Sequence, residues 1–483
     1  MRYISTRGQA PPVSFLDAVL AGMAPDGGLY VPEIWPSLND GLVSGREASP
    51  GVADGYIANS GYGFCAGAAL ATLSGGAYST TEAWKLARDI YHWSDNWPPA
   101  VTPLVQLDSG KWLLELFHGP SLSFKDVAMQ FIAPLYDRAL EARGERLTVL
   151  CATSGDTGGA AVEALKKSER VDLVVLLPRG RVSEVQRRFM TTAGAANVHA
   201  IEIDGDFDAC QAIVKAMFAD RDFVARARLS AVNSINWARI LAQSVYYHVA
   251  AQTLCGHGPV CCSVPTGNFG DAYSGYVAKR MGAPIGAIMI ATNANDILDR
   301  AINTGEYARA AQSSATLSPA MDIQVASNFE RILFEALDRN GDHVRRLFEQ
   351  FAQSGRFTIP ASALEFLREH FASWAIDDAE TLATMKSAHT ESGQLVCPHT
   401  AVALAAAANE FDEDRAKLDL PVVHLATAHP AKFPETVKRA TGVRPELPQK
   451  CADLFQRSEK FDSLPADAEA VKQYIRERSR AWS

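Results

Sequence analysis

A single lysine, Lys125, follows a short run of small and apolar residues, Ser121 to Phe124, and stands at the head of a helical pattern. An amine held in an apolar pocket loses the solvation of its charged form, so its pKa falls and it becomes nucleophilic. Lysine is also common on protein surfaces, where it has no such role. Taken alone, Lys125 therefore leaves two interpretations open, a reactive amine and a surface lysine at the start of a helix.

A glycine-containing turn, Thr266-Gly267-Asn268-Phe269-Gly270, follows an apolar run and precedes a helical pattern. Glycine lets the backbone approach an anion closely, and the start of a helix offers free N–H donors and the positive end of the helix dipole. A phosphate group suits such a turn. The alternative is a turn that only reverses the chain, and the motif alone does not separate the two.

A second turn, Ser154-Gly155-Asp156-Thr157-Gly158, has the same setting between an apolar run and a helical pattern. The hydroxyls of Ser154 and Thr157 add donors to the backbone N–H groups, so the turn could bind a carboxylate or a phosphate. The alternative is a helix cap, because Ser, Asp and Thr cap helices routinely.

A third polar cluster, Asn233-Ser234-Ile235-Asn236-Trp237-Ala238-Arg239, combines amide, hydroxyl and guanidinium groups. Such groups suit an oxyanion, and arginine can bind one through two hydrogen bonds. By itself, the cluster is better interpreted as a capped helix start.

Two further patterns do not indicate a site. Gly61 to Ala66 fits a degenerate dinucleotide fingerprint, but no strand precedes it. Asp338 to Asp342 suggests a calcium loop but lacks the ligand spacing and the final glutamate, so a solvated turn is expected.

The elements that must position these residues alternate between strand and helix. This alternation predicts parallel sheets with helices on both faces, an α/β fold. Ligands of such sheets bind at the carboxyl ends of the strands, where both glycine turns fall. Residues 361–415 are expected to be mostly helical. The expected strands are 147–152, 171–177, 198–203, 260–264, 285–291 and 422–426, and the expected helices include 159–167, 183–192, 207–218, 272–281 and 401–408.

The composition excludes several classes of protein. A chain of 483 residues is too long for one core, and its net charge of −9 argues against a nucleic-acid surface. No apolar run is long enough to span a bilayer, and Asp17 interrupts the best candidate for a secretion signal. The eight cysteines form no C-x-x-C pair and no zinc spacing, so we expect reduced thiols, a cytoplasmic location and no metal site.

Taken together, the motifs resemble the long-chain bacterial and fungal branch of the threonine synthase family. The region from Asp40 to about Tyr78 fits the family pattern poorly and carries no functional expectation. Its first part, as far as Gly63, is rich in turn-forming residues. The segments that carry the resemblance are Tyr3 to Gly8, Ala24 to Pro32, Phe117 to Asp126, the Ser154 turn, Asn233 to Asn236, Gly267 to Gly270 and Ala426 to Phe433.

The resemblance implies a type II pyridoxal-phosphate fold with a large and a small parallel-sheet domain. On this basis we expect an N-terminal module at 1–100 and a large cofactor-binding α/β domain at 101–145 and 241–445. A small α/β domain is expected at 146–240 and a C-terminal helical tail at 446–483.

The resemblance also implies a cofactor site. Lys125 would carry pyridoxal 5'-phosphate as a Schiff base, and Thr427 would face the pyridine nitrogen as a neutral hydroxyl. The turn from Thr266 to Gly270 would bind the cofactor phosphate.

The implied substrate is O-phospho-L-homoserine, which would react with water to give L-threonine and phosphate, the last step of threonine biosynthesis. Lys125 would act as the base at three adjacent carbons. Asp156 stands where related enzymes commonly carry asparagine. The residues expected to bind the substrate carboxylate or phosphate are Ser154, Gly155, Asp156, Thr157, Asn233, Ser234, Asn236 and Arg239.

Two alternatives remain at this point. A phospho-lyase or dehydratase would eliminate phosphate and release a 2-keto acid, and the glycine turns do not separate it from a threonine-forming lyase. A non-catalytic relative would keep the fold as a binding protein, although the intact Lys125 argues against it. We expect a small-molecule substrate, no nucleic-acid or membrane partner and a monomer, with a dimer left open.

Overall fold

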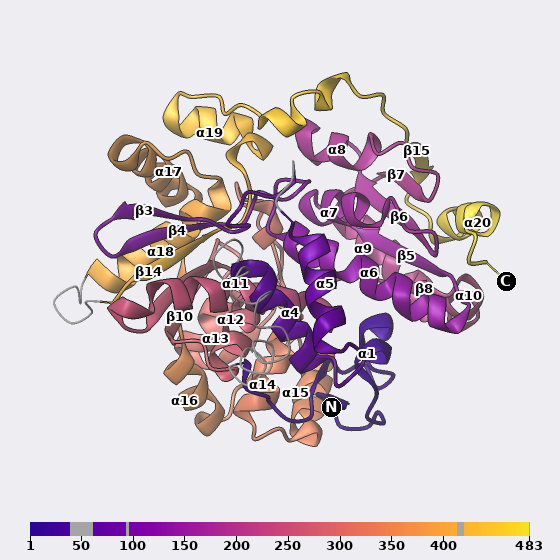
Figure 1. Cartoon of the computed structure of the whole chain (residues 1–483), viewed down its shortest axis with the longest axis horizontal. Helices are drawn as coiled ribbons and strands as arrows, with labels where there is room; N and C mark the ends of the chain where they lie inside the picture. Colours follow the sequence, from indigo (N-terminus) through magenta and orange to yellow (C-terminus); the bar gives the residue numbers. More distant parts are fainter. Residues whose placement is uncertain (39–60, 93–95, 413–419, 483) are drawn as a thin grey trace. The chain divides into compact units, whose positions relative to one another are not determined.

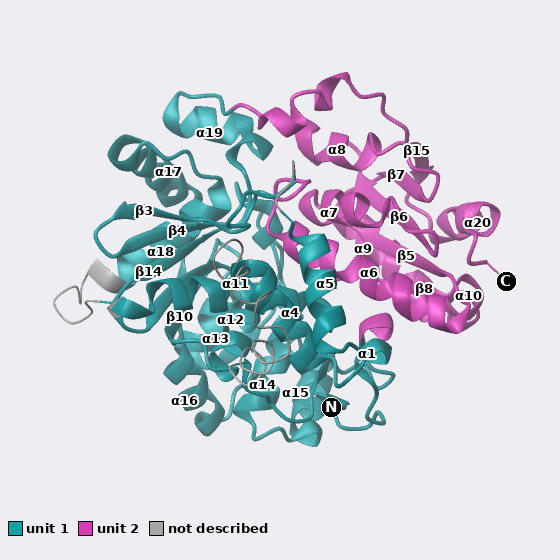
Figure 2. Cartoon of the chain, in the orientation of Figure 1, with its two compact units in different colours: residues 1–18, 23–118, 234–445 teal, residues 19–22, 119–233, 446–483 magenta. Residues whose placement is uncertain are grey.

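The computed structural model describes residues 1–38, 61–92, 96–412 and 420–482, shown in Figure 1. Contacts between residues divide the chain into two compact units, coloured separately in Figure 2. Unit 1 comprises residues 1–18, 23–118 and 234–445, and unit 2 comprises residues 19–22, 119–233 and 446–483. The domain boundaries drawn from the sequence remain a prediction, and residues 40–60 of the turn-rich stretch lie outside the described residues.

Unit 1 contains a six-stranded sheet in the order β13-β10-β9-β14-β4-β3. Five of these strands run parallel, and β3 pairs antiparallel with β4 at one edge. Their bounds are β3 (Leu104–Asp108), β4 (Lys111–Glu115), β9 (Val260–Pro265), β10 (Ile285–Thr292), β13 (Phe371–Ala375) and β14 (Val422–Ala426). The carboxyl ends of the parallel strands therefore share one edge of the sheet.

Helices cover both faces of this sheet, because successive side chains of a strand point to opposite faces. Met289 and Ala291 of β10 pack against α18 (Pro398–Asp412), whereas Ile288 lies against Gly275 of α12 (Gly270–Arg280). The other elements of unit 1 are β1 (Tyr3–Ser5), β2 (Tyr30–Pro32), α4 (Gly61–Leu73), α5 (Thr80–Ile90), α11 (Trp237–Leu254), α13 (Ile297–Thr304), β11 (Glu306–Ala308), α14 (Phe329–Ala336), α15 (Gly341–Ser354), β12 (Arg356–Thr358), α16 (Ala361–His370), α17 (Asp378–Ser392) and α19 (Pro434–Thr441). The helix α1 (Phe15–Ala21) has residues in both units.

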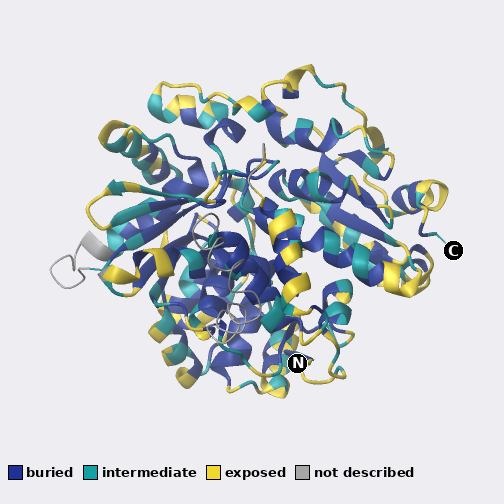
Figure 3. Cartoon of the chain, in the orientation of Figure 1, coloured by how far each residue is buried: buried dark blue, intermediate teal, exposed yellow. Residues whose placement is uncertain are grey.

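Unit 2 contains a five-stranded, all-parallel sheet in the order β15-β7-β6-β5-β8. All eight residues of its central strand β6 are buried, as expected for a parallel strand covered on both faces. The strands are β5 (Leu147–Ala152), β6 (Val171–Pro178), β7 (Val198–Asp204), β8 (Leu229–Ser230) and β15 (Asp462–Pro465). Figure 3 shows that buried residues follow the strands and the inward faces of the helices.

The two faces of this second sheet bury different helices. Val174 and Leu176 pack in one cluster with Ile213 of α9 and Ile475 of α20, whereas Val175 lies against Gly158 of α7. The helices of unit 2 are α6 (Lys125–Arg143), α7 (Asp156–Leu165), α8 (Glu184–Thr191), α9 (Phe207–Ala219), α10 (Arg221–Ala227) and α20 (Ala468–Arg478).

The structure confirms the predicted α/β class and the six predicted strands, each to within one residue. The expectation that residues 361–415 are mostly helical is right for three segments but wrong at Phe371–Ala375, which forms the edge strand β13. The sequence patterns also gave no sign of β3 and β4, or of the helix α4 that begins in the glycine-rich stretch at Gly61. Within the described residues, no helix is both long and apolar enough to cross a membrane.

Candidate active site

Lys125 is the first residue of α6 and is buried, with 9% of its surface exposed. The next residue, Asp126, is fully buried and fixes the loop in front of the helix. Its carboxylate accepts hydrogen bonds from the N–H of Ser121 (2.9 Å), the hydroxyl of Ser121 (2.7 Å) and the N–H of Ser123 (3.3 Å). The carboxylate of Asp126, the hydroxyl of Ser121 and the backbone N–H groups of Ser121 and Ser123 therefore form a clasp that holds Lys125 in place.

Gly119 lies against this clasp, where no larger residue fits. A Cβ atom at Gly119 would lie 2.2 Å from Cβ of Asp126. The ammonium of Lys450 donates to the carbonyl of Gly119 at 3.1 Å, so the C-terminal segment of unit 2 also supports the loop.

The Lys125 ammonium has a buried carboxylate beside it. Nζ of Lys125 lies 3.6 Å from Oδ2 of Asp156, and the other oxygen of Asp156 accepts a hydrogen bond from Nε2 of Gln186 at 2.9 Å. The two charged side chains are 11% and 5% exposed, respectively. Gln186 therefore orients Asp156, which lies beside the amine of Lys125.

The Ser154 turn joins β5 to α7, which begins at Asp156. The hydroxyl of Thr153, one residue before the turn, accepts hydrogen bonds from the N–H groups of Gly155 and Gly158, both at 2.9 Å. The hydroxyls of Ser154 and Thr157 and the N–H of Thr157 in the first turn of α7 can donate to a ligand. This geometry suits a carboxylate.

Unit 1 carries the other glycine turn, between β9 and α12. Phe269 adopts a left-handed conformation with φ of 61°, and α12 begins at Gly270. A Cβ atom at Gly267 would lie 2.8 Å from the carbonyl oxygen of Ala320, so only glycine fits there. The hydroxyl of Thr266 donates to the carbonyl of Val264 at 2.7 Å and so braces the turn. The turn presents the first N–H groups of a helix from a close-packed backbone, which fits a phosphate group.

The cluster around Asn236 is a capped helix start, as its residues alone indicated. Oδ1 of Asn236 accepts a hydrogen bond from the N–H of Ala238 at 3.0 Å, and α11 begins at Trp237. Arg239, on the first turn of α11, is 3% exposed and Asn236 is fully buried. Ser234 is half-buried and belongs to unit 1, whereas Asn233 is exposed and belongs to unit 2.

Thr427 directly follows β14 and is buried. Because β9 and β14 run parallel, Thr427 and the turn from Thr266 to Gly270 lie at the same edge of the unit 1 sheet. Lys125 and the turn from Ser154 to Thr157 belong to unit 2. Lys125 begins α6, and the turn lies between β5 and α7.

Several residues in these settings escaped the sequence analysis. Asp126 was visible as part of the lysine motif, but its role depends on a loop conformation that the pattern does not reveal. The others are Thr153 and Gln186, which no sequence motif singled out.

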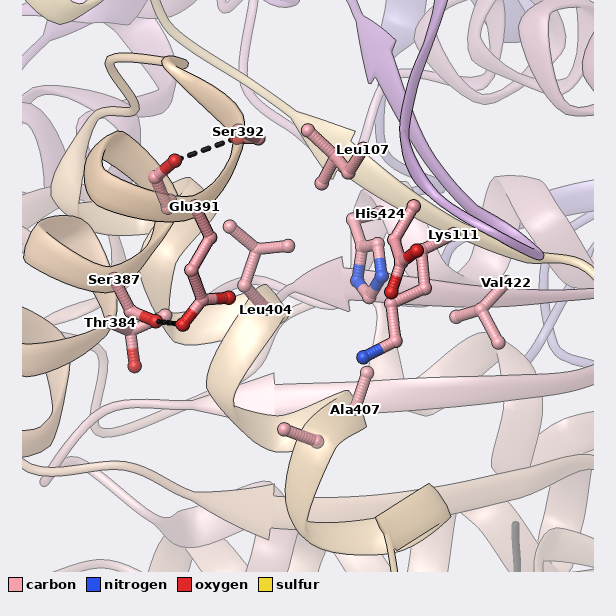
Figure 4. Close-up of a pocket in the computed structure, with 13 residues that line it drawn as sticks. Leu107, Lys111, Thr384, Ser387, Glu391, Ser392, Leu404, Ala407, Val422 and His424 are labelled. Atoms are coloured by element: carbon pink, nitrogen blue, oxygen red, sulfur yellow. Dashed lines mark hydrogen bonds between the residues drawn. The ribbon is translucent and has the colours of Figure 1, made fainter. Parts of the chain in front are cut away.

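A pocket of about 350 Å³ opens elsewhere in unit 1 and is shown in Figure 4. It is lined by Lys111 and Val422, the first residues of β4 and β14, together with residues of α17 and α18. The ring of His424 also lines it and is buried, which lowers its pKa to about 4. The pocket lies at the amino ends of the strands, away from the edge that carries Thr427. Among the described residues, no group of His, Cys, Asp and Glu could hold a metal ion.

Family models match three parts of the chain. One described as "Threonine synthase N terminus" matches residues 2–49, and one described as "Pyridoxal-phosphate dependent enzyme" matches residues 98–350. A third, described as "Threonine synthase, C-terminal", matches residues 400–475.

Similar proteins cover nearly the whole chain. A threonine synthase from Pseudomonas aeruginosa is 44% identical over 98% of this chain and 98% of its own. One from Saccharomyces cerevisiae is 37% identical over 98% of this chain and 97% of its own. A crystal structure of threonine synthase from Brucella melitensis with bound pyridoxal phosphate is similar with a TM-score of 0.91 and 46% identity, covering 100% of both chains.

Proposed function

The chain belongs to the threonine synthase family, and we propose that Lys125, the turn from Thr266 to Gly270 and Thr427 are the residues that bind its cofactor. The protein is an enzyme that depends on pyridoxal 5'-phosphate. It converts O-phospho-L-homoserine and water to L-threonine and inorganic phosphate, a carbon–oxygen lyase reaction. The assignment of individual residues that follows is our proposal.

The observation that carries this proposal is the setting of Lys125. The clasp around Asp126 holds its amine at the start of a buried helix, next to the oriented carboxylate of Asp156. Nζ of Lys125 binds the cofactor covalently. The turn from Thr266 to Gly270 holds the cofactor phosphate through the N–H groups at the start of α12, and Thr427 offers a neutral hydroxyl to the ring nitrogen.

When bound, pyridoxal phosphate supplies an electron sink for charge that develops on the substrate carbons. Lys125 does the proton work. Its amine would remove the α-proton and then move protons at the β- and γ-carbons, while phosphate leaves the γ-carbon and water adds at the β-carbon. The four-methylene stem of lysine lets one base reach three adjacent carbons.

The substrate has two anionic groups and the chain offers two settings for them. The hydroxyls of Ser154 and Thr157 and the start of α7 bind the carboxylate. Arg239, Ser234 and Asn236 bind the phosphate, with Asn233 at the edge of this set.

Two of the turn residues serve the substrate indirectly. The N–H of Gly155 donates to the hydroxyl of Thr153, so Gly155 serves substrate binding through the backbone conformation that it gives the turn. Asp156 acts on the substrate through Lys125, whose ammonium it contacts.

We further propose that the enzyme is a cytoplasmic monomer. Its eight cysteines are all free, which suits a reducing compartment. Size-exclusion chromatography with light scattering measures the mass; a dimer mass at micromolar protein would contradict the monomer.

The test combines spectroscopy with product analysis. The purified protein is incubated with O-phospho-L-homoserine, products are identified by NMR, and the visible absorption band of the lysine-bound cofactor is recorded. We expect threonine and phosphate from the wild type, and neither the band nor threonine from Lys125→Ala. The matched control is Lys111→Ala, which removes a lysine at the amino end of β4, the opposite end of the unit 1 strands from Thr427, and should keep both. A 2-keto acid in place of threonine would identify a phospho-lyase, and a protein without band or turnover would be a binding relative.

A further inference from the structure

Asn328, which belongs to none of the motifs above, contacts two of the segments proposed to bind phosphate. It is fully buried in unit 1. Its backbone N–H donates to the carbonyl of Asn268 at 3.0 Å, and its side-chain Nδ2 donates to the same carbonyl at 3.1 Å. The same Nδ2 also donates to the carbonyl of Ser234 at 3.2 Å. One amide group therefore joins the turn from Thr266 to Gly270 to the segment from Ser234 to Arg239.

Arg331, one turn further along α14, fixes the orientation of this amide. Its Nη1 donates to Oδ1 of Asn328. Because a guanidinium only donates, it holds Oδ1 on its own side and leaves Nδ2 to face the two carbonyls. Arg331 also donates to the carbonyl of Tyr30 at 3.1 Å and to that of Ile235 at 2.6 Å.

The guanidinium of Arg331 is fully buried and stays charged at neutral pH, although burial lowers its pKa to about 10. Within the part of the chain that the structure describes, it donates to two backbone carbonyls and one amide oxygen. Such a cation needs all of these acceptors, so it resists any movement of Ile235 or Asn328 away from it. The close packing continues at Gly270, where a Cβ atom would lie 3.1 Å from Nδ2 of Asn328.

We propose that Asn328, oriented by Arg331, is a positioning residue that holds the cofactor-phosphate turn and the substrate-phosphate segment in one fixed arrangement. This inference rests on the function proposed above for those two segments. Without the amide, the carbonyl of Ser234 loses this donor and that of Asn268 keeps only the backbone N–H of residue 328, so the two segments are coupled less firmly. The enzyme then binds both phosphate groups less tightly, although the residues that contact them are unchanged.

The experiment compares two aldehydes that differ only in the phosphate group. Apoprotein is titrated with pyridoxal 5'-phosphate and with pyridoxal, and the visible absorption band gives a Kd for each. In Asn328→Ala, we expect about tenfold weaker binding of pyridoxal phosphate, from the loss of two buried hydrogen bonds. Binding of pyridoxal should change less than about twofold, because its aldehyde needs only the lysine. At saturating cofactor, the KM for O-phospho-L-homoserine should rise by a larger factor than kcat falls.

Two further variants separate positioning from stability. Glu330→Gln removes a buried carboxylate that binds Thr6 at 2.6 Å and Arg7 at 2.9 Å, so it should lower the unfolding temperature but leave the ratio of the two Kd values as in the wild type. Asn328→Asp keeps the size of the side chain and its contact with Arg331 but cannot donate to the two carbonyls. It should show the same loss of preference for pyridoxal phosphate in a folded protein, and it decides the matter if Asn328→Ala does not fold.

The outcomes also distinguish this inference from the proposed function. If the wild type binds pyridoxal phosphate no more tightly than pyridoxal, the proposed phosphate turn is wrong and the inference falls with it. If the wild type shows the preference and both Asn328 variants retain it, the proposed function stands and the inference alone is overturned.

Discussion

Gly155 has a backbone that an L residue rarely adopts, with φ of 136° and ψ of −72°. Substituting alanine should therefore strain the turn before α7. The added Cβ atom would also lie 2.4 Å from Cδ of Gln186, the side chain that orients Asp156. We predict that Gly155→Ala strongly destabilises unit 2, because Gly155 is also buried.

The magnitude follows from two effects. The strained backbone costs about 1–3 kcal/mol. Displacing the Gln186 amide costs a further ~1–3 kcal/mol, since it breaks the 2.9 Å hydrogen bond to a buried carboxylate. We therefore expect the free energy of unfolding to fall by about 4 kcal/mol.

Urea unfolding followed by far-UV circular dichroism measures this change, with Gly180→Ala as the matched control. Gly180 also has a positive φ, 68°, but no atom lies within 4 Å of its Cβ position. The control should therefore lose only about 1–2 kcal/mol, the backbone part alone.

The clash predicts that the effect of Gln186→Ala on the free energy of unfolding changes sign when Gly155→Ala is present. Gln186→Ala should destabilise the wild type by about 1 kcal/mol, since it removes a hydrogen bond. In the Gly155→Ala background the same substitution should be stabilising, because it makes room for the new methyl group. Equal losses for the two glycine variants, or additive effects of Gly155→Ala and Gln186→Ala, would refute this reasoning.

Two further predictions concern unit 1. Burial lowers the pKa of His424 from 6.5 to about 4. Between these pH values the unfolded chain binds a proton at this residue and the folded chain does not, so the free energy of unfolding falls as the pH drops from about 6.5 to 4. His424→Leu should reduce the loss of unfolding free energy between pH 7 and pH 5 by about 2 kcal/mol in urea titrations, and an unchanged loss would contradict the assignment. A neutral partner at the cofactor ring nitrogen should make the ring a weaker electron sink, so Thr427→Asp should raise the share of 2-keto acid in the products measured by NMR. Thr427→Ser should keep the wild-type ratio, and the same ratio in both variants would show that Thr427 does not control it.

The two-residue strand β8 and the largely exposed edge strand β15 show no apolar run. Six other strands could be predicted because most of their residues are buried and each reads as an apolar run: β5, β6, β7, β9, β10 and β14. The edge strand β13 could not, since Trp374 and Ala375 are exposed and the segment is defined by its pairing with β10. The strands β3 and β4 likewise alternate only weakly in burial.

The helix α4 was missed for a different reason. Glycine disfavours helices, yet Gly67 is required inside this one, because a Cβ atom there would lie 2.2 Å from Cδ1 of Trp84. Tertiary packing between α4 and α5 thus overrides the local preference of the sequence.

The candidate site shows the same limit. The glycine turns and Lys125 can be recognised in the sequence, since their chemistry needs particular residue types at short spacing. Asn328 does not, because its partners Asn268 and Ser234 lie 60 and 94 residues away in the sequence. Positioning residues of this kind become visible only when distant segments are brought together.

The edge strand β15 has a consequence for how the chain is made. It pairs with β7, yet β7 ends at Asp204 and β15 begins at Asp462, near the C-terminus. At ~5–20 residues per second, a ribosome needs on the order of tens of seconds to make the intervening chain. Throughout that time the outer edge of β7 has no strand to pair with, and an open edge is a template for pairing with other chains. The sheet of unit 2 is thus completed only after residue 465 has been made, and a nascent chain that stalls before residue 462 leaves the outer edge of β7 uncovered.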